Sequence, residues 1–327
     1  MKFTNITNIP LPIAVWAVND NYDYVDDPKY LSVTSLLKPV RVIILSKRID
    51  YENLTNDVEN LVASAMGTSI HDSIESAWTK NYKENLKVLG YADSVIDRFK
   101  INPEKIEEGD IPIYLEQRTV KEFNGYKIGG KFDFVADGLL HDNKSTTAYK
   151  WTTGSSDEDY QLQGSLYRWL NPDKITEDFI RINFVFTDWQ KLMAMKDPNY
   201  PQHRAMFKDI PLLSIPETEA WLRRKLDLVT RYWNADEKDI PECTDEELWR
   251  SPTQYKYYAN PEATRATKNF DNLMDANKFK AQKGKGIVKI IPGEARRCNY
   301  CSATTICSQY RRLHSDGSDQ CTAFPGN

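Results

Sequence analysis

The sequence predicts an α/β protein in which helices flank a mixed central sheet and a cysteine-ligated metal or cluster appendage follows at the carboxy-terminal end. Three observations support this fold class. Two dipeptides typical of tight hairpin turns, Asn124-Gly125 and Asp137-Gly138, separate runs in which apolar and polar residues alternate. Apolar residues recur at helical spacing on both sides of these runs. Three cysteines then lie within ten residues near the carboxy-terminal end.

The composition is that of a globular protein with a sizeable core, because 40% of the 327 residues are hydrophobic and 28% are charged. A net charge of −4 argues against a uniformly basic coat for nucleic acid, but it allows a local basic groove. We find no long apolar window and no basic start followed by an apolar segment, so we expect no membrane span, no signal peptide and no membrane partner. Five cysteines favour a metal site in a reducing cytoplasm over a disulfide framework.

Three regions are expected along the chain: a helical or irregular N-terminal region over residues 1–55, a core over 56–235, and a basic, cysteine-containing region over 236–327. In the first region, Ser32–Leu37 starts with a helix-capping residue and stops before Pro39, which predicts a short helix. The apolar run Arg41–Lys47 fits either a strand or a helix.

Helical spacing of apolar residues extends from Asn56 to about Lys80 and places His71 and Glu75, four residues apart, on one face. A histidine that makes one hydrogen bond is the ordinary interpretation of His71, and a role at a metal site is the alternative. A second charged helix is predicted over Leu86–Ile106.

Three consecutive antiparallel strands come next, over Ile113–Phe123, Tyr126–Ala136 and Leu139–Ser145. If both turns are two-residue loops, the register follows by counting outward from them. Asp133 then lies opposite Asp142 on the third strand, and Glu116 lies opposite Asp133 on the first. Lys144 shares this face because it stands two residues beyond Asp142.

Directly opposed like charges destabilise a sheet, so a row of three carboxylates predicts a cation that neutralises it. Carboxylate oxygens favour Mg²⁺ or Mn²⁺ over softer metals. The alternative is that these are ordinary polar residues on a solvated face. The alignment of Glu116, Asp133 and Asp142 with Lys144 favours the metal site.

The segment after the strands starts with Ser156–Asp159, which has the Ser-x-x-acid pattern of a helix cap, and helical spacing continues to about Leu170. Gln163 and Tyr167 fall on one stripe of this helix. They are either a half-buried tyrosine with a polar neighbour or a pair that orients the substrate or the lysine.

Alternation predicts a further strand over Phe179–Phe186, and helical spacing predicts an amphipathic helix over Pro216–Trp233. A second capping pattern, Thr244–Glu247, is expected to open a short helix that runs through Trp249.

The last third of the chain is basic. Residues 251–312 contain twelve lysines and arginines but only four acids, and tyrosines interleave with them. A locally basic segment in an acidic protein is expected where the chain binds a phosphate backbone. A solvated charged face has the same composition.

The trio Cys298-x2-Cys301-x5-Cys307 ends the basic stretch, and three thiols at this spacing can converge on one metal. Tetrahedral thiolate sites need four ligands, and the candidates for the fourth are Cys243 and Cys321. Spacing alone does not decide between zinc and an iron–sulfur cluster.

These motifs together resemble the PD-(D/E)xK nuclease superfamily, in its RecB-type branch that includes CRISPR-associated iron–sulfur exonucleases and phage-encoded relatives. The resemblance runs from about Tyr30 to Cys307. The matching motifs, in chain order, are Gly67-x3-His71-x2-Ile74-Glu75, Gly130-x2-Asp133, Asp142-Asn143-Lys144, Gln163-x3-Tyr167 and the cysteine trio. The family's proline is absent, since Phe132 precedes Asp133. Its upstream fourth cysteine is also absent, and the surroundings of Cys243 resemble a segment of the phage-type relatives.

The resemblance implies a restriction-endonuclease-like core and hydrolysis of DNA phosphodiesters with Mg²⁺ or Mn²⁺. Asp133, Asp142 and the carbonyl of Asn143 would hold the metal, with His71 as a further ligand. The register argument adds Glu116. Lys144 would position the attacking water, while the helix pair Gln163 and Tyr167 would orient the scissile strand or the lysine.

The resemblance also implies a [4Fe–4S] cluster, with zinc as the alternative, on Cys243, Cys298, Cys301 and Cys307. We therefore expect a DNA exonuclease for recombination or end processing, encoded by a phage and working in the host cytoplasm beside a single-strand annealing or recombination partner. A structure-specific endonuclease and a non-catalytic DNA-binding accessory protein are the alternatives.

Overall fold

The computed structural model describes residues 1–20 and 23–315, which form two compact units. The larger unit comprises residues 2–38 and 56–227, and the smaller comprises residue 1, residues 39–55 and residues from 228 onward. Residues 39–55 thus join the carboxy-terminal part of the chain, whereas residues 2–38 join the central part. No helix in the described ranges is both long enough and apolar enough to cross a membrane.

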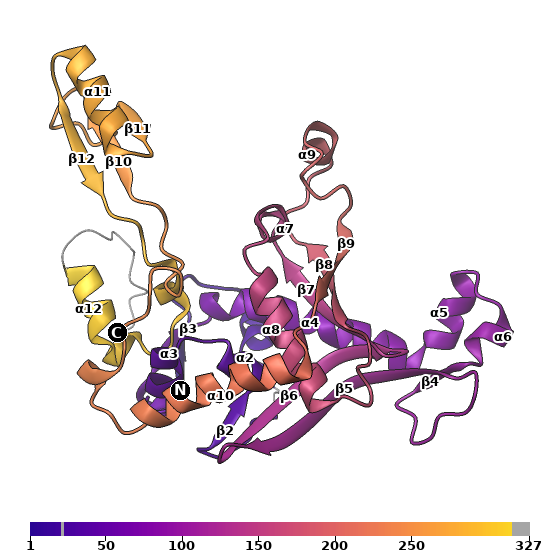
Figure 1. The fold of residues 1–327 in the computed structure, drawn as a ribbon. Coiled ribbons are helices and arrows are strands. Elements are labelled where there is room, and N and C mark those ends of the chain that lie inside the picture. The colour runs from indigo at the N-terminus through magenta and orange to yellow at the C-terminus, as the bar shows by residue number, and fades with distance from the viewer. Residues whose placement is uncertain (21–22, 316–327) are drawn as a thin grey trace. The chain divides into compact units, whose positions relative to one another are not determined.

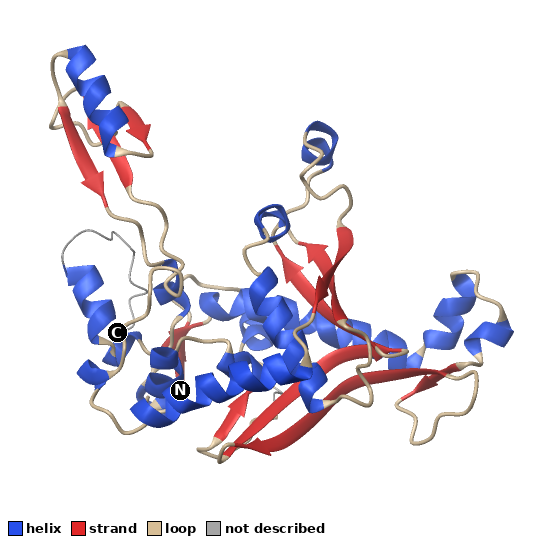
Figure 2. Ribbon diagram, viewed as in Figure 1, coloured by secondary structure: helices blue, strands red, loops and turns tan. Residues whose placement is uncertain are grey.

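The larger unit is built on a curled, seven-stranded mixed sheet (Figures 1 and 2). Its strands, in sheet order, are β4 (Phe99–Ile101), β5 (Ile111–Phe123), β6 (Tyr126–Ala136), β7 (Leu139–Thr146), β8 (Phe179–Phe186) and β9 (Ala205–Pro211). Strand β2 (Tyr30–Ser32) pairs in parallel with β6. The pairs β4–β5 and β7–β8 are also parallel, and the other pairs are antiparallel. The predicted mixed α/β fold is therefore confirmed.

Helices flank this sheet, as predicted. They are α1 (Leu11–Ala17), α2 (Val33–Leu36), α4 (Glu59–Lys80), α5 (Tyr82–Val88), α6 (Asp93–Ile96), α7 (Ala148–Thr153), α8 (Asp157–Leu170), α9 (Lys191–Lys196) and most of α10 (Ile215–Tyr232). A small sheet of β1 (Lys2–Thr4) and β3 (Thr55–Asp57) precedes α4. Helix α4 packs on the sheet through Gly67, which faces Ser145, and through Trp78, whose ring lies 5.1 Å from that of Phe134.

Both hairpins form as the turn residues predict. Asn124 and Gly125 have φ angles of 47° and 78°, and Asp137 and Gly138 have φ angles of 47° and 85°, as type I′ turns require. Strands β5, β6 and β7 each begin and end within two residues of their predicted bounds.

Two predicted helices are wrong. The segment Leu86–Ile106 does not form one helix, because Gly90 adopts a φ of 90° after α5; α6 and the short strand β4 follow it. The capping bonds of Thr244–Glu247 do form, with the Thr244 amide donating to Glu247 at 3.0 Å and the Glu247 amide donating to the threonine hydroxyl at 3.2 Å. The segment stays a series of turns, and Trp249 leaves the helical region with a φ of 51°.

A third correction concerns the start of α8. Ser156 occupies the predicted cap position, but its side chain makes no capping hydrogen bond to the helix. Its hydroxyl instead accepts a hydrogen bond from Nζ of Lys150 at 2.8 Å.

The smaller unit contains α3 (Val40–Ser46), so the ambiguous run at Arg41–Lys47 is a helix. Its apolar face packs in a core of Ile44, Leu45, Ile240 and Ala303. Helix α12 (Ser308–Ser315) follows the cysteine trio.

The smaller unit also contains an element that the sequence did not predict, a three-stranded antiparallel sheet with one helix. It consists of β10 (Gln254–Tyr258), β11 (Lys268–Phe270), α11 (Leu273–Lys283) and β12 (Ile287–Ile291), and we call residues 251–293 the lysine module. Its two ends are joined, because the Ser251 amide donates to the Glu294 carbonyl at 3.0 Å. Gly293 is required there, since a Cβ would lie only 1.5 Å from the Ser251 carbonyl oxygen.

Candidate functional site

The sheet ladder between β5 and β6 is interrupted at Glu116. The pairs on either side, Leu115 with Phe134 and Gln117 with Phe132, keep the predicted register, which sets Glu116 level with Asp133. Glu116 itself leaves the ladder with a φ of 49°. A left-handed conformation of a residue with a Cβ costs about 1–3 kcal/mol and is typical of functional sites.

A second interruption lies on the other side of Asp133. Pairing between β6 and β7 ends at Phe134 and His141, whereas the pairing of β7 with β8 continues to Thr146. Oδ2 of Asp133 accepts the Asn143 amide hydrogen at 3.0 Å, so this carboxylate replaces a strand carbonyl as the acceptor. The predicted direct pairing of Asp133 with Asp142 is therefore wrong in detail, because β7 has already diverged at that point.

Helix α4 brings His71 to the same place. His71 lies on the helix stripe of Gly67 and Trp78, which both contact the sheet, and its Nδ1 is 3.1 Å from Oδ2 of Asp133. One donor atom each from His71, Glu116 and Asp133 lies within 4.8 Å of the other two. Donors bound to one Mg²⁺ at about 2.1 Å lie roughly 3–4 Å apart, so this set fits a divalent cation after a small adjustment.

The charges in this group influence one another. The hydrogen bond to Asp133 outweighs burial and raises the pKa of His71. Burial acts to raise the pKa of Asp133, but the hydrogen bond and charge of His71 and the amide of Asn143 leave it below its ordinary value. Burial raises the pKa of Glu116 despite the Lys131 ammonium, whose Nζ is 2.5 Å from its carboxylate.

The backbone at Glu116 gives a test of this geometry. We expect Glu116→Gly to be more stable than Glu116→Ala by about 1 kcal/mol, because glycine adopts a positive φ without strain. At Glu122, on the same strand but in the regular ladder opposite Lys127, the order should reverse. Urea unfolding of the four variants measures the difference. Equal stability of Glu116→Gly and Glu116→Ala would contradict the left-handed backbone.

Asp142 and Lys144 form a second group on β7. Asp142 is buried, and its Oδ2 lies 2.6 Å from Nζ of Lys144. Burial raises the pKa of Asp142 despite this ion pair. Burial acts to lower the pKa of Lys144, but the charge and hydrogen bond of Asp142 outweigh it and leave the pKa raised. The lysine therefore carries its charge at neutral pH.

Helix α8 holds Asp142 in place. Nε2 of Gln163 donates to Oδ1 of Asp142 at 3.1 Å and lies 3.4 Å from the hydroxyl of Tyr167. The Tyr167 ring leaves no room for a side chain at Gly130, because a Cβ there would lie 2.7 Å from the ring. Both side chains are buried, and the pair reaches Asp142 through the hydrogen bond from Gln163.

Two neighbours of these groups were missed by sequence reasoning. Lys131 pairs with Glu116, and its position two residues before Asp133 on one strand could have indicated the shared face. Tyr160 lies with its ring 5.8 Å from Nζ of Lys144, and its position on α8, three residues before Gln163, offered a similar signal.

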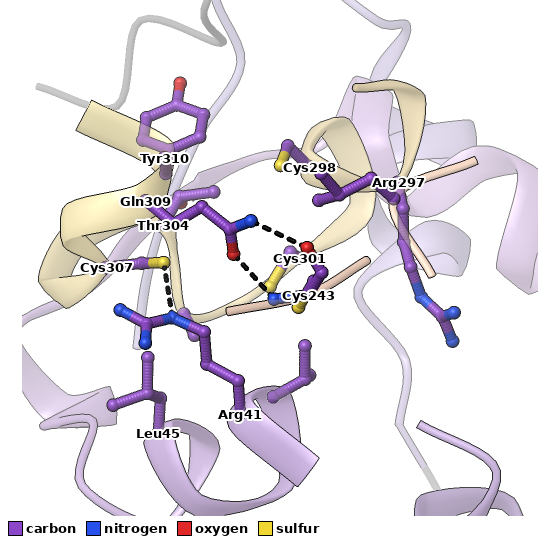
Figure 3. A pocket seen from close by; sticks show the side chains of 13 residues that line it. Arg41, Leu45, Cys243, Arg297, Cys298, Cys301, Thr304, Cys307, Gln309 and Tyr310 are labelled. Atoms are coloured by element: carbon purple, nitrogen blue, oxygen red, sulfur yellow. Dashed lines mark hydrogen bonds between the residues drawn. The ribbon is translucent and has the colours of Figure 1, made fainter. Parts of the chain in front are cut away.

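The four cysteines Cys243, Cys298, Cys301 and Cys307 line one pocket of the smaller unit (Figure 3). The side chain of Gln309 fixes Cys243 there by accepting from its amide at 2.9 Å and donating to its carbonyl at 2.8 Å. These cysteines form no disulfide with one another. The alternative fourth ligand, Cys321, lies outside the described residues.

The buried side chain of Arg41 also reaches this pocket, and no sequence motif indicated it. Its Nε donates to Sγ of Cys307 at 3.3 Å, and its other nitrogens bond the Ile240 carbonyl and the Ser308 hydroxyl at 2.8 and 3.2 Å. Glu237 forms an ion pair with it. The guanidinium thus places a fixed positive charge beside the sulfur of Cys307.

Burial, reinforced by the charge of Glu247, raises the pKa of Cys243 to about 12. This thiol is therefore protonated at neutral pH unless a metal cation replaces its proton. A set of four sulfur donors beside an arginine fits a soft metal or a cluster.

No protein-family model matches the chain, and no curated protein matches it. Among solved structures, the crystal structure of SSO0001 is similar, with 14% sequence identity and a TM-score of 0.42. The match covers 69% of this chain and 87% of that one. Similarity at this level assigns neither a fold family nor an activity.

Proposed function

We propose that the larger unit is a nuclease core of the PD-(D/E)xK type, which hydrolyses DNA phosphodiester bonds with Mg²⁺ or Mn²⁺ and acts as an exonuclease. One observation carries the proposal. Potential cation ligands from His71, Glu116 and Asp133 converge on the sheet beside the ion pair of the buried Asp142 with the half-buried Lys144. Carboxylates next to a charged lysine suit the attack of water on a phosphodiester, in which negative charge accumulates.

The residues divide into ligands and charge carriers. His71, Glu116 and Asp133 would hold the cation, with Asp142 and the Asn143 carbonyl as neighbouring donors. When bound, a divalent cation supplies Lewis acidity and a water of lowered pKa. Asp142 raises the pKa of Lys144. The Lys144 ammonium can therefore donate to a phosphate oxygen and to water, and it offsets the negative charge that develops on the phosphate.

Gln163 acts as a positioning residue in this proposal. Its bond to Oδ1 of Asp142 fixes the carboxylate, and Oδ2 of the same carboxylate fixes Lys144. Gln163 thus positions Asp142, and Asp142 positions Lys144, which reduces the reorganisation of the lysine needed during the reaction.

Metal removal tests the proposal. We expect EDTA to stop the cleavage of labelled linear DNA, Mg²⁺ or Mn²⁺ to restore it, and Ca²⁺ to support binding without turnover. His71→Gln should raise the Mg²⁺ concentration that gives half-maximal cleavage, because it removes one ligand and leaves Lys144 in place. The matched control is His141→Gln, which replaces the next histidine along the chain.

Linear and circular substrates separate the alternatives. Cleavage of linear DNA alone supports an exonuclease, cleavage of covalently closed circles supports an endonuclease, and DNA binding without cleavage under every metal supports an accessory protein. Cleavage that persists in EDTA would overturn the metal-dependent proposal.

We propose further that Cys243, Cys298, Cys301 and Cys307 hold a [4Fe–4S] cluster with a structural role. Four thiolates can hold either zinc or a cluster. We propose the cluster because the cysteine trio matches in spacing that of the iron–sulfur branch that the sequence motifs resemble.

A further inference from the structure

The lysine module has one sheet face covered by its own helix (Figure 1). The Phe279 ring of α11 lies 5.2 Å from the Tyr257 ring and 5.3 Å from the Phe270 ring. Tyr257 is fully buried. Because side chains alternate along a strand, the neighbours of Tyr257 on β10 point to the opposite face.

That opposite face carries two lysines directly across from each other. Lys256 on β10 pairs with Lys289 on β12 and, on its other side, with Asn269 on β11. Nζ of Lys289 lies 4.9 Å from the centre of the Tyr258 ring, which is on the same face and is buried, whereas Lys289 and Asn269 are exposed. Like charges directly opposed destabilise a sheet, and an anion bound between the two ammonium groups would offset their repulsion.

The remaining charges of the module do not provide that anion. Residues 251–293 contain eight basic and three acidic side chains. Within the described structure, none of the eight forms an ion pair with a carboxylate. Asp275 accepts a hydrogen bond from Asn272 at the start of α11 instead. A surplus of five positive charges thus remains in a chain whose net charge is −4.

We propose that the sheet face of Lys256, Tyr258, Asn269 and Lys289 binds the phosphate backbone of a nucleic acid, with both lysines on the same or adjacent phosphates. The inference deepens the proposed nuclease function, since it names a second contact with that substrate. Phosphate oxygens accept from several ammonium groups at once, and Asn269 adds a neutral donor of the kind found at backbone contacts. The backbone of either single-stranded or duplex DNA supplies this chemistry.

The test measures binding without cleavage, in the full chain carrying Asp133→Asn. Fluorescence anisotropy of labelled single-stranded and duplex DNA is recorded over a range of salt concentrations. The double variant Lys256→Gln/Lys289→Gln removes the opposed pair. Lys278→Gln/Lys280→Gln removes the same charge from exposed positions on α11. Lys256→Arg/Lys289→Arg keeps the charge.

We expect the first variant to reduce the slope of log affinity against log salt by about 1.4 for single strands or about 1.8 for a duplex, since each contact contributes about 0.7 or 0.9. The DNA form in which the loss reaches the value of two full contacts identifies the natural backbone. The α11 variant should lose less than half as much, and the arginine variant should keep the slope. Circular dichroism verifies that each variant folds.

Equal losses from both glutamine variants would overturn the inference, because they would show only diffuse attraction. Unchanged slopes in both would overturn it as well, and would leave an acidic protein surface as the partner. These results are independent of the metal site. If the chain with Asp133 intact cleaves DNA but the Lys256 pair does not affect binding, the inference fails alone. If the pair affects binding but no metal supports cleavage, the proposed nuclease function fails alone.

Discussion

Asp133→Asn and Lys144→Gln are each expected to lower the rate of DNA cleavage at least ~100-fold, the scale observed when one preorganised charged group is removed from an active site. Asparagine at position 133 can still accept the Asn143 amide hydrogen, so β7 should keep its place. The two variants should differ in metal affinity. Asp133→Asn should weaken Mn²⁺ binding, because it removes an ionised ligand, whereas Lys144→Gln should not. Single-turnover cleavage and calorimetric metal titration measure the two effects.

Matched controls exist on strand β9, which β8 separates from β7 in the sheet. Asp209→Asn removes a carboxylate that pairs with Arg181 in the same sheet, and Lys208→Gln removes a lysine that pairs with Asp157. Both should stay within a few-fold of the unmodified protein. An equally large loss of cleavage rate in these controls would show that the effect arises from a disturbed sheet and not from the site. Near-normal cleavage by Lys144→Gln would remove the lysine from the mechanism.

Cys298→Ala is expected to yield poorly folded protein that lacks the cluster. A metal site that joins Cys243 to Cys298 closes a loop of more than fifty residues, and cross-linking such a loop stabilises a protein by about 4 kcal/mol in the chain-entropy model. The alanine variant should therefore lose most of its soluble yield. Iron, sulfide and zinc content of anaerobically purified protein gives the second measurement.

Cys321→Ala is the control, and it discriminates between the two candidates for the fourth ligand. If Cys243 is that ligand, as the pocket indicates, Cys321→Ala should keep full metal content and yield. Stoichiometric zinc without iron would replace the cluster by a zinc site. A normal yield of Cys298→Ala, together with neither iron nor zinc in the unmodified protein, would reject both the cluster and the zinc site.

The part of the larger unit that could be predicted depends on local chemistry. Asn124-Gly125 and Asp137-Gly138 require particular turns, and a two-residue turn determines the register of its strands. Counting from those turns placed Glu116 level with Asp133, which the structure confirms. The fixed helical period likewise placed Gln163 and Tyr167 side by side.

What could not be predicted depends on tertiary contacts. The ladder between β6 and β7 ends before Asp142, and beyond that point β7 keeps its pairing with β8, a strand more than thirty residues later. Arg41 reaches Cys307 across 266 positions of sequence, and no local pattern records such a contact. The small sheet of the lysine module could not be predicted, because strands such as Lys268–Phe270 are too short to show the alternation of apolar and polar residues.

The division of the smaller unit into distant segments determines when it can be completed during synthesis. Ile44 and Leu45 on α3 pack against Ile240 and Ala303, which leave the ribosome about two hundred or more residues later. All segments of the larger unit have been synthesised by residue 227, before either partner. The apolar face of α3 therefore lacks its packing partners during the time in which the larger unit can already fold. Contacts between such distant positions form slowly, so the nascent chain exposes this helix to chaperones and proteases while the intervening residues are synthesised.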